Sequence, residues 1–310
     1  MRVVRTPGEL AVESAEFLNM TLGNFDGLHR GHQAVIAELV RSAGIRGGVS
    51  VAVTFDPHPL VVVRPDVAPR LLSLTEEKLE AMSATGLDVA LVVDFTREIA
   101  SEDALTFLSW LGVGRGSHLV LGYDFQMGRD RACDLATLSG MGSELGFGLD
   151  VVPPVEHDGL PISSSRIRAC VEEGDVEGAA AMLGRPYRIR GSVVAGAGLG
   201  RDLGAPTANL SVAREKLLPA DGVYFAAVEG TGSRPGLLYV GTRPTLGPGG
   251  RVAEVHILDF EGELYGSELA VSVLRRLRGD AQFDGTEELS RRIREDIERA
   301  RSMSNGGEDV

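Results

Sequence analysis

Lysine is nearly absent from this chain of 310 residues. Only Lys78 and Lys216 occur, although lysine and arginine together number 31. Neither stands between a glycine and a serine or threonine, as the lysine of a phosphate-binding P-loop does. P-loop chemistry is therefore excluded, and we expect any nucleotide site to use histidine, arginine, helix N-termini and glycine-rich backbone, without lysine.

Positive charge, cysteine and long apolar runs are also scarce. The formal net charge of -13 argues against nucleic acid as a partner, because proteins that bind it usually carry a basic face. Cys133 and Cys170 lack a C-x-x-C spacing, which argues against a zinc site and favours a reducing compartment. No segment approaches the roughly 18 apolar residues of a membrane helix, and no signal peptide is visible. We expect a cytoplasmic protein without a membrane partner, and a homo-oligomer is compatible with these features.

The first half of the chain has the pattern of a doubly wound α/β domain. Short β-branched runs alternate with helical patterns, which favours a parallel sheet flanked by helices. The predicted strands lie near residues 19–25, 49–55, 89–95, 118–123 and 149–154. The predicted helices lie near residues 31–43, 75–86 and 101–112, the last with Ser101 as its N-cap.

The second half has a different pattern. Two short helices end at Gly174 and at Gly184, and Pro186 follows them, so we predict domains at 1–186 and 187–310. Beyond Pro186, β-runs separated by glycine and proline have no helix between them, which predicts a small antiparallel barrel. A C-terminal helix with apolar residues at spacings of four should pack on that barrel.

The first motif joins the predicted strand at 19–25 to the helix that follows it. The string GNFDGLHRGH places His29 and His32 at the start of that helix. A helix N-terminus presents backbone N–H groups and a positive dipole end to an anion. Two imidazoles there can donate hydrogen bonds to phosphate oxygens as charge builds in a transition state, which suits nucleotidyl transfer. The plainer interpretations are a helix cap or a partial metal site.

This string resembles the G-x-F-D-G-x-H-x-G-H motif of the FMN adenylyltransferase module of bacterial bifunctional riboflavin kinase/FAD synthetases. The strings TFDPHP (54–59), GYDFQMG (122–128) and ISSSRIR (162–168) are similar to further strings of that module. The resemblance implies that the two histidines are catalytic. It implies ATP contacts from Gly23, Phe25, Asp26, Gly31, Ser164, Ser165 and Arg168. It implies flavin contacts from Asp56, His58, Asp124 and Phe125, with Asp124 beside the flavin or the metal.

Simpler interpretations of these strings exist. A hydroxyl cluster with an arginine one turn on is an anion site, but alone it is more often only an N-cap. The string DPHP is also a good turn former. Gln126 and Met127 stand where the family usually has arginine and phenylalanine, a change that would weaken FMN binding or alter the adenylylation step.

The second motif is GLGRDLGAPTAN at 198–209. Glycine repeats alone are weak evidence, because in β-proteins they more often mark turns. Thr207 and Asn209 lie two residues apart on an extended segment, which places both side-chain oxygens on one face, able to ligate Mg²⁺. The string resembles the G-R-x-L-G-x-P-T-A-N motif of riboflavin kinases. That resemblance implies ATP-phosphate contacts from Gly198, Gly200, Arg201 and Gly204.

A third candidate is Glu254, in the β-run RVAEVHILDF. It shares a strand face with His256, whereas the apolar side chains point the other way. A carboxylate can accept the proton of an alcohol that attacks ATP, although an ordinary solvent-facing glutamate is the simpler interpretation. The resemblance implies that Glu254 is the base for the riboflavin 5′-hydroxyl.

The resemblance spans nearly the whole chain and implies a bifunctional enzyme. Riboflavin, FMN and ATP would be its small-molecule substrates and Mg²⁺ its cofactor. One alternative is a riboflavin kinase with a weakened or altered adenylyltransferase half, suggested by Gln126 and Met127. The other is a non-catalytic flavin or nucleotide sensor.

Overall fold

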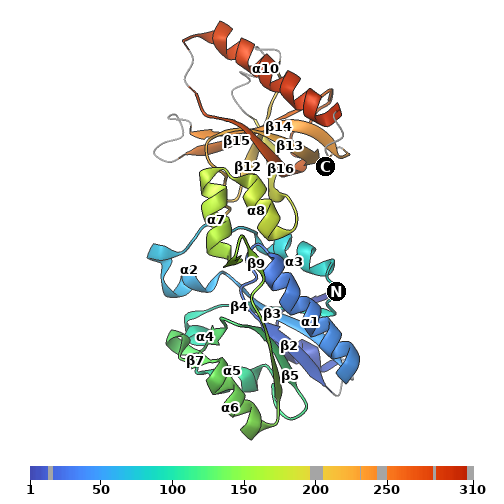
Figure 1. Ribbon diagram of the computed structural model, residues 1–310, viewed down its shortest axis with the longest axis vertical. Helices are drawn as coiled ribbons and strands as arrows, with labels where there is room; N and C mark the ends of the chain where they lie inside the picture. Colours follow the sequence, from blue (N-terminus) through green and yellow to red (C-terminus); the bar gives the residue numbers. More distant parts are fainter. Residues whose placement is uncertain (13–16, 196–204, 231, 243–249, 282–283, 306–310) are drawn as a thin grey trace. The chain divides into compact units, whose positions relative to one another are not determined.

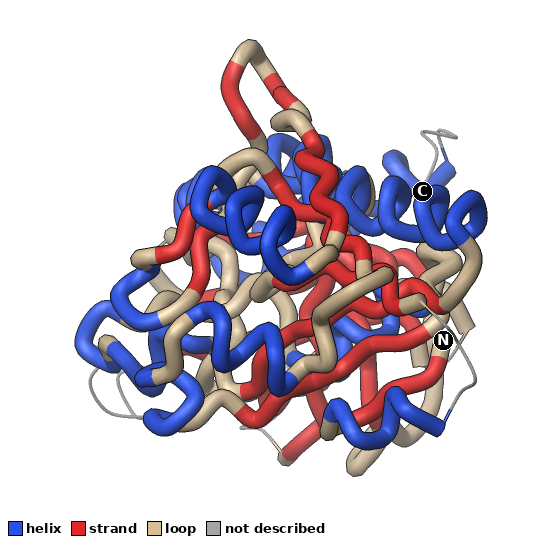
Figure 2. Tube along the Cα trace, turned by 90° about the horizontal axis from the view of Figure 1, so that it is seen from below, coloured by secondary structure: helices blue, strands red, loops and turns tan. Residues whose placement is uncertain are grey.

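The computed structural model describes residues 1–12, 17–195, 205–230, 232–242, 250–281 and 284–305. Its contacts divide the chain into two compact units, Met1–Ser164 and Ser165–Val310. Figure 1 follows the chain through both units, and Figure 2 distinguishes its helices from its strands by colour. Within the described residues, no helix is long and apolar enough to cross a membrane.

A six-stranded parallel sheet forms the centre of the first unit, with the order β1-β4-β3-β2-β5-β8. Its strands are β1 (Arg2–Val4), β2 (Leu18–Leu22), β3 (Val49–Asp56), β4 (Val89–Asp94), β5 (His118–Gly122) and β8 (Gly148–Val152). The chain moves from β2 to β3 and β4 on one side, then returns to place β5 on the other side of β2. The sheet therefore has a topological switch point between β2 and β5, where ligands bind in such folds.

Helices cover both faces of this sheet because successive strand residues point to opposite faces. Met20, Val51 and Val53 pack with Leu108 of α5 (Ala104–Trp110) and Leu138 of α6 (Leu135–Leu145). On the other face, Ala52 and Ala90 pack with Ile36 and Leu39 of α1 (Arg30–Arg46) and Met82 of α3 (Thr75–Ser83). The predicted doubly wound arrangement is confirmed.

Short elements complete the first unit. They are α2 (Pro59–Val63), α4 (Arg97–Ser101), the 3-10 helices η1 (Pro7–Val12), η2 (Pro65–Val67) and η3 (Arg129–Arg131), and the hairpins β6 (Gln126–Met127) with β7 (Cys133–Asp134) and β9 (Glu156–His157) with β10 (Leu160–Pro161). The prediction that Ser101 caps a helix is wrong, because Ser101 is the last residue of α4. The cap of α5 is Asp103, whose carboxylate accepts the N–H of Thr106 at 2.8 Å.

A closed antiparallel barrel forms the centre of the second unit, with the order β11-β12-β15-β14-β13-β16. Its strands are β11 (Tyr187–Val194), β12 (Ala208–Val212), β13 (Gly222–Glu229), β14 (Arg234–Thr242), β15 (Arg251–Ile257) and β16 (Glu268–Gly279). The C-terminal helix α10 (Thr286–Asn305) packs on β14, with Ile297, Ala300 and Met303 in one cluster with Leu237. The predicted barrel and its packed helix are confirmed.

Two helices, α7 (Ser164–Glu173) and α8 (Val176–Leu183), precede the barrel. Gly184 ends α8 in the left-handed conformation, as expected of a helix-terminating glycine. The N–H of Ala220 donates to the carbonyl of Val171 at 3.1 Å, and Arg275 pairs with Glu177 at 2.9 Å. Both helices therefore pack with the barrel. The predicted domain boundary after residue 186 stays a prediction.

Candidate active sites

The two motif histidines lie together at the start of α1, which follows β2 at the switch point. His29 is the N-cap, and its Nδ1 accepts the backbone N–H of His32 at 3.3 Å. The imidazole rings are stacked, with centroids 3.6 Å apart, and Phe25 meets His32 edge-on. Because Nδ1 of His29 is an acceptor, neutral His29 carries its proton on Nε2. The hydrogen bond that caps α1 and the stacking of the two rings thus fix the orientation of both imidazoles.

The electrostatic environment keeps His32 neutral at neutral pH. Burial lowers its pKa well below the usual value, and the nearby charges of His29 and Lys78 lower it further. Its Nδ1 is buried without a hydrogen-bond partner among the described residues. A neutral imidazole still has one N–H, so His32 can donate a hydrogen bond to a phosphate oxygen.

An aspartate in the turn between β2 and α1 anchors that turn to a neighbouring loop. Asp26 is buried, and its carboxylate accepts the backbone N–H groups of Leu72 at 3.1 Å and Ser73 at 2.9 Å. Asp26 therefore supports the turn, whereas a role in contacting ATP stays a prediction. Two glycines allow the close packing: a Cβ on Gly23 would lie 3.1 Å from the ring of Phe25, and one on Gly31 would lie 3.1 Å from Nδ1 of His29.

A cavity of about 680 Å³ opens at the carboxyl ends of the central strands. It brings together three of the sequence motifs. Its lining includes Gly23, Phe25 and His32 after β2, Phe55 and Pro59 of TFDPHP, and Asp124 and Phe125 after β5. Gln126 and Met127, the two positions that depart from the family pattern, also line it. The size suits a nucleotide or flavin, since ligand sites usually measure about 300–1,000 Å³.

The string TFDPHP lines this cavity with Phe55 and Pro59, whereas its two polar residues have other contacts. His58 caps α2 by accepting the N–H of Leu60 at 3.2 Å, and its other nitrogen lies 3.3 Å from Nδ2 of Asn24. Asp56 ends β3 and lies 3.9 Å from Arg5. Neither Asp56 nor His58 is among the lining residues, so their predicted flavin contact stays a prediction.

The string ISSSRIR contacts the same turn through Ser164. The hydroxyl of Ser164 donates to the carbonyl of Asp26 at 3.0 Å, which joins the two motifs. Ser165 and Arg168 lie on α7 and belong to the second unit. Their contact with ATP stays a prediction from the motif.

Lys78 was missed by the sequence analysis. It is 5% exposed, and its Nζ donates to the carbonyl of Asn24 at 3.1 Å and to Oγ1 of Thr54 at 2.8 Å. A lysine thus contacts the residues that form the wall of the cavity, which the sequence analysis did not expect. The available signal was spacing: Lys78 precedes buried Met82 by four residues, which puts both on the buried face of α3.

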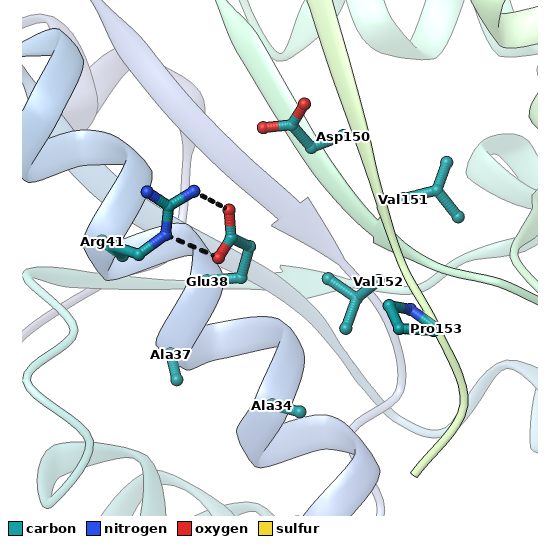
Figure 3. A pocket seen from close by; sticks show the side chains of 8 residues that line it. All are labelled: Ala34, Ala37, Glu38, Arg41, Asp150, Val151, Val152 and Pro153. Carbon is teal, nitrogen blue, oxygen red and sulfur yellow. Dashed lines mark hydrogen bonds and ion pairs between the residues drawn. The ribbon is translucent and has the colours of Figure 1, made fainter.

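A second hollow of about 610 Å³ lies between α1 and the edge strand β8. Ala34, Ala37, Val151 and Val152 face it, and Arg41 is hydrogen-bonded to Glu38 at its rim (Figure 3). None of the predicted site residues lines it. The cavity beside His32 is therefore the candidate site of the first unit.

The second site gathers on one face of the barrel. Oγ1 of Thr207 donates to the carboxylate of Glu254 at 3.2 Å, and Asn209 lies directly opposite Glu254 in the pairing of β12 with β15. Residues directly opposite in a sheet point to the same side. His256 lies on the same strand face as Glu254, and its Nδ1 is 2.9 Å from the carbonyl of Pro206. The three predicted residues thus lie together.

Tyr239 flanks this group and was also missed. It lies opposite Glu254 in the pairing of β14 with β15, and its hydroxyl donates to Asp280 at 3.4 Å. Burial raises the pKa of Tyr239 to about 12, with further contributions from Asp280 and Glu254, so the phenol keeps its proton at neutral pH. A tyrosine in an otherwise apolar strand gave no separate sequence signal.

The donor set suits a hard cation. Thr207 and Asn209 offer oxygen atoms beside a carboxylate, the ligand type that Mg²⁺ prefers. Because the Thr207 proton points to Glu254, the lone pairs of its oxygen remain able to coordinate. Within the described part of the chain, no group of three or more histidine, cysteine or acidic side chains has the arrangement of a metal site. The predicted phosphate contacts Gly198, Gly200, Arg201 and Gly204 lie outside the described residues.

Comparison with known proteins assigns both units. Residues 12–166 match the FAD synthetase family model and residues 183–304 the riboflavin kinase model. The bifunctional riboflavin kinase/FMN adenylyltransferase of Pseudomonas fluorescens is 39% identical, with 92% of each chain covered. That of Escherichia coli (strain K12) is 35% identical, with 98% of each covered. The crystal structure described as a macrolide-efflux protein from Streptococcus pneumoniae has a TM-score of 0.86 at 29% identity, covering 96% of this chain and 98% of that one.

The fold and the two sites define an enzyme with a nucleotidyltransferase-like α/β unit and a riboflavin kinase barrel. The chain belongs to the family of bifunctional riboflavin kinase/FMN adenylyltransferases. Its function is flavin cofactor synthesis in two steps: riboflavin is phosphorylated to FMN, and FMN is adenylylated to FAD. No finding supports the alternatives of a weakened adenylyltransferase half or a non-catalytic sensor.

Proposed function

We propose that the histidine pair carries the adenylyl transfer in the first unit. An oxygen of the FMN phosphate attacks the α-phosphorus of ATP, a P–O bond forms, and pyrophosphate leaves. His29 and His32 donate hydrogen bonds to phosphate oxygens as charge builds on them. Support comes from the stacked pair at the helix N-terminus and from the position of His32 in the wall of the 680 Å³ cavity.

Other residues complete this proposed site. Gly23, Phe25 and Gly31 shape the turn that receives ATP, and Asp124 and Phe125 contact the flavin from the other side of the switch point. Ser164, Ser165 and Arg168 contact the phosphates, and Asp26, Asp56 and His58 hold the surrounding loops. Positioning of this kind lowers the barrier without a covalent intermediate.

In the barrel we propose that Glu254 is the catalytic base. Its carboxylate accepts the proton of the riboflavin 5′-hydroxyl while that oxygen attacks the γ-phosphorus of ATP, and ADP leaves. The single observation that supports this most is the contact between Glu254 and Thr207, which places the base beside the oxygen donors of Thr207 and Asn209. Gly198, Gly200, Arg201 and Gly204 would approach the phosphates.

Mg²⁺ is the metal that we propose for Thr207 and Asn209. When bound, it neutralises phosphate charge as the γ-phosphoryl group is transferred. The side chains of this chain hold the oxygen ligands in place and keep the base at the same face of the barrel.

We also propose the partners, the cellular compartment and the assembly of the enzyme. Small molecules are its substrates, and the net charge of -13 disfavours nucleic acid as a further partner. The free thiols of Cys133 and Cys170 suit the cytoplasm. Domain borders at 1–186 and 187–310, and assembly into a homo-oligomer, remain proposals from the sequence pattern.

A reciprocal pair of variants tests the division of labour. Glu254→Gln removes the base but keeps the shape, so FMN production from riboflavin should fall by about 10²–10⁴-fold while FMN is still converted to FAD. His32→Ala should do the reverse, with FAD formation lowered by about 10²-fold and FMN production retained. The flavins are separated by chromatography over time.

Glu268→Gln provides the matched control, because Glu268 is an exposed glutamate of the same barrel on β16. Both activities should survive that change. Loss of both activities in a folded Glu254→Gln variant would refute the assignment, as would FMN production at the rate of the unmodified enzyme.

A further inference from the structure

Lys78 is a buried cation placed where two chain segments meet. Its side chain comes from α3, and its Nζ lies 3.1 Å from the carbonyl of Asn24, 2.8 Å from Oγ1 of Thr54 and 3.4 Å from the carbonyl of Phe55. Asn24 belongs to the turn after β2, whereas Thr54 and Phe55 belong to the end of β3. One ammonium group therefore joins two strand ends.

Both joined segments form the wall of the cavity. Asn24 and Phe55 line it, and Lys78 lies behind them without lining it. Oγ1 of Thr54 also donates to the carbonyl of Asn24 at 3.1 Å, so that carbonyl is bound from two sides. Asp26 binds the same turn to the backbone just before α3. The turn that carries the histidine pair is thus bound both by Lys78 of α3 and by the segment just before α3.

Such a placement is costly for a lysine. Burial lowers the pKa of Lys78 to about 8, although the charges of Asp26 and Asp56 act in the opposite direction. An apolar side chain would avoid this cost, because replacing buried charges by apolar residues is often neutral or stabilising. A buried cation with a perturbed pKa next to a cleft marks a candidate functional position, although structural ion pairs also perturb pKa values.

The charge of Lys78 also acts on His32. The groups that face the ammonium are Asp26 from the turn, Asp56 from β3 and His32 from α1. A positive charge disfavours a second positive charge nearby, so protonated Lys78 opposes protonation of His32. His29, stacked on His32, acts in the same direction.

We propose that Lys78 is a positioning residue of the adenylyl-transfer site, which joins the turn after β2 to the end of β3 and whose charge opposes a second positive charge on His32. This rests on the proposed role of His32. The lysine touches neither substrate nor reacting atoms. It fixes the wall from which Asn24 and Phe55 face the ligand, and its charge adds to the effects of burial and of His29 on His32.

The test is the pH dependence of FAD formation from supplied FMN and ATP, measured for Lys78→Met between about pH 5 and pH 9. Loss of the charged hydrogen bonds should lower kcat/KM about tenfold. Without the neighbouring charge, His32 takes up a proton more readily, so the acidic limb of the profile should move to higher pH. Lys78→Arg retains the charge and should leave the acidic limb where the unmodified enzyme has it.

Lys216→Met is the matched control. Lys216 is 4% exposed and lies over the ring of Tyr187 in the second unit, so the same change is made at an equally buried lysine. FMN adenylylation should be unaffected by it. The kinase activity of the Lys78→Met sample, expected within about twofold of the unmodified rate, reports an intact barrel.

The outcomes are separable. An unmodified enzyme that makes no FAD would refute the proposed function itself. Where it makes FAD, an unchanged rate and profile in Lys78→Met overturns the positioning role, and so does a rate loss without movement of the acidic limb, which marks a purely structural contact. If Lys78→Met leaves the first unit unfolded, Thr54→Val removes both hydrogen bonds of Thr54 Oγ1 at nearly constant volume and keeps the charge of Lys78. There kcat/KM should fall while the acidic limb stays in place, and an unchanged kcat/KM overturns the positioning role.

Discussion

Gly31 lies just inside α1, directly beside the imidazole of His29. An added Cβ would lie 3.1 Å from Nδ1 and 3.2 Å from Cε1 of that ring. Nδ1 is the atom that accepts the N–H of His32, so the ring cannot turn away without giving up the helix cap. At this position glycine is required by close approach and not by backbone conformation.

Gly31→Ala should therefore lower FAD formation. Displacing a catalytic group by a few tenths of an ångström weakens its alignment with the reacting atoms, and we expect kcat/KM for FMN adenylylation to fall about tenfold. Gly44 of the same helix is the control, because a Cβ there meets nothing within 4 Å. Gly44→Ala should leave the rate unchanged and stabilise the helix by up to about 1 kcal/mol. Equal rates in both variants would contradict the argument.

Residues close in sequence were the easier ones to predict. His29 and His32 lie three apart on one helix, and Thr207 and Asn209 two apart on one extended segment, so their proximity follows from local geometry. Lys78 is different, since its partners Asn24 and Thr54 are 54 and 24 residues away. No period in the sequence reveals such a contact, which depends on how the sheet folds.

At the scale of elements, one buried ion pair joins the C-terminal helix to the barrel. Arg278 of β16 donates to both carboxylate oxygens of Asp296 in α10, with Nη2 2.8 Å from Oδ2. The two side chains are 15% and 10% exposed. Arg299 of the same helix donates to the carbonyl of Leu277 at 3.1 Å. Apolar packing by Ile297 and Ala300 alone would leave the register of α10 less well defined.

Asp296→Ala should destabilise the second unit, because it leaves Arg278 largely buried without its carboxylate. We expect a loss of about 3 kcal/mol in the free energy of unfolding, measured in denaturant. Glu295→Ala removes a neighbouring carboxylate that pairs with Arg291 and Arg292 at the surface, and it should change stability little. Similar losses in the two variants would show that burial does not determine the strength of this pair.

The elements that sequence reasoning missed are short or locally unfavourable. β1 has three residues, and α6 carries Gly140, Gly142 and two serines, which are poor helix formers. Tertiary packing of Leu138 and the caps at Asp134 and Gly146 stabilise α6 instead. The five strands predicted in the first unit each contain valine or threonine. These β-branched residues favour strands, and the strands are largely buried or half-buried in the structure.

At the scale of the whole molecule, both lysines are buried. Lys78 is 5% exposed in the α/β unit, and Lys216 is 4% exposed in the barrel unit. The basic side chains at the surface of the described residues are therefore arginines. The chain has only two lysines, and each is buried in a different unit.

An amine-reactive ester should therefore leave both lysines unmodified in the native protein, apart from reaction at the chain's terminal amine. The pKa of Lys78, lowered to about 8 by burial, would make it a good nucleophile near pH 8 if it were accessible, so its protection would come from burial alone. Mass spectrometry of peptides after native labelling should find neither lysine modified, and labelling in denaturant should modify both. Rapid native modification of Lys78 would show that the contact with Asn24 and Thr54 opens in solution, and it would remove the basis for a fixed cavity wall.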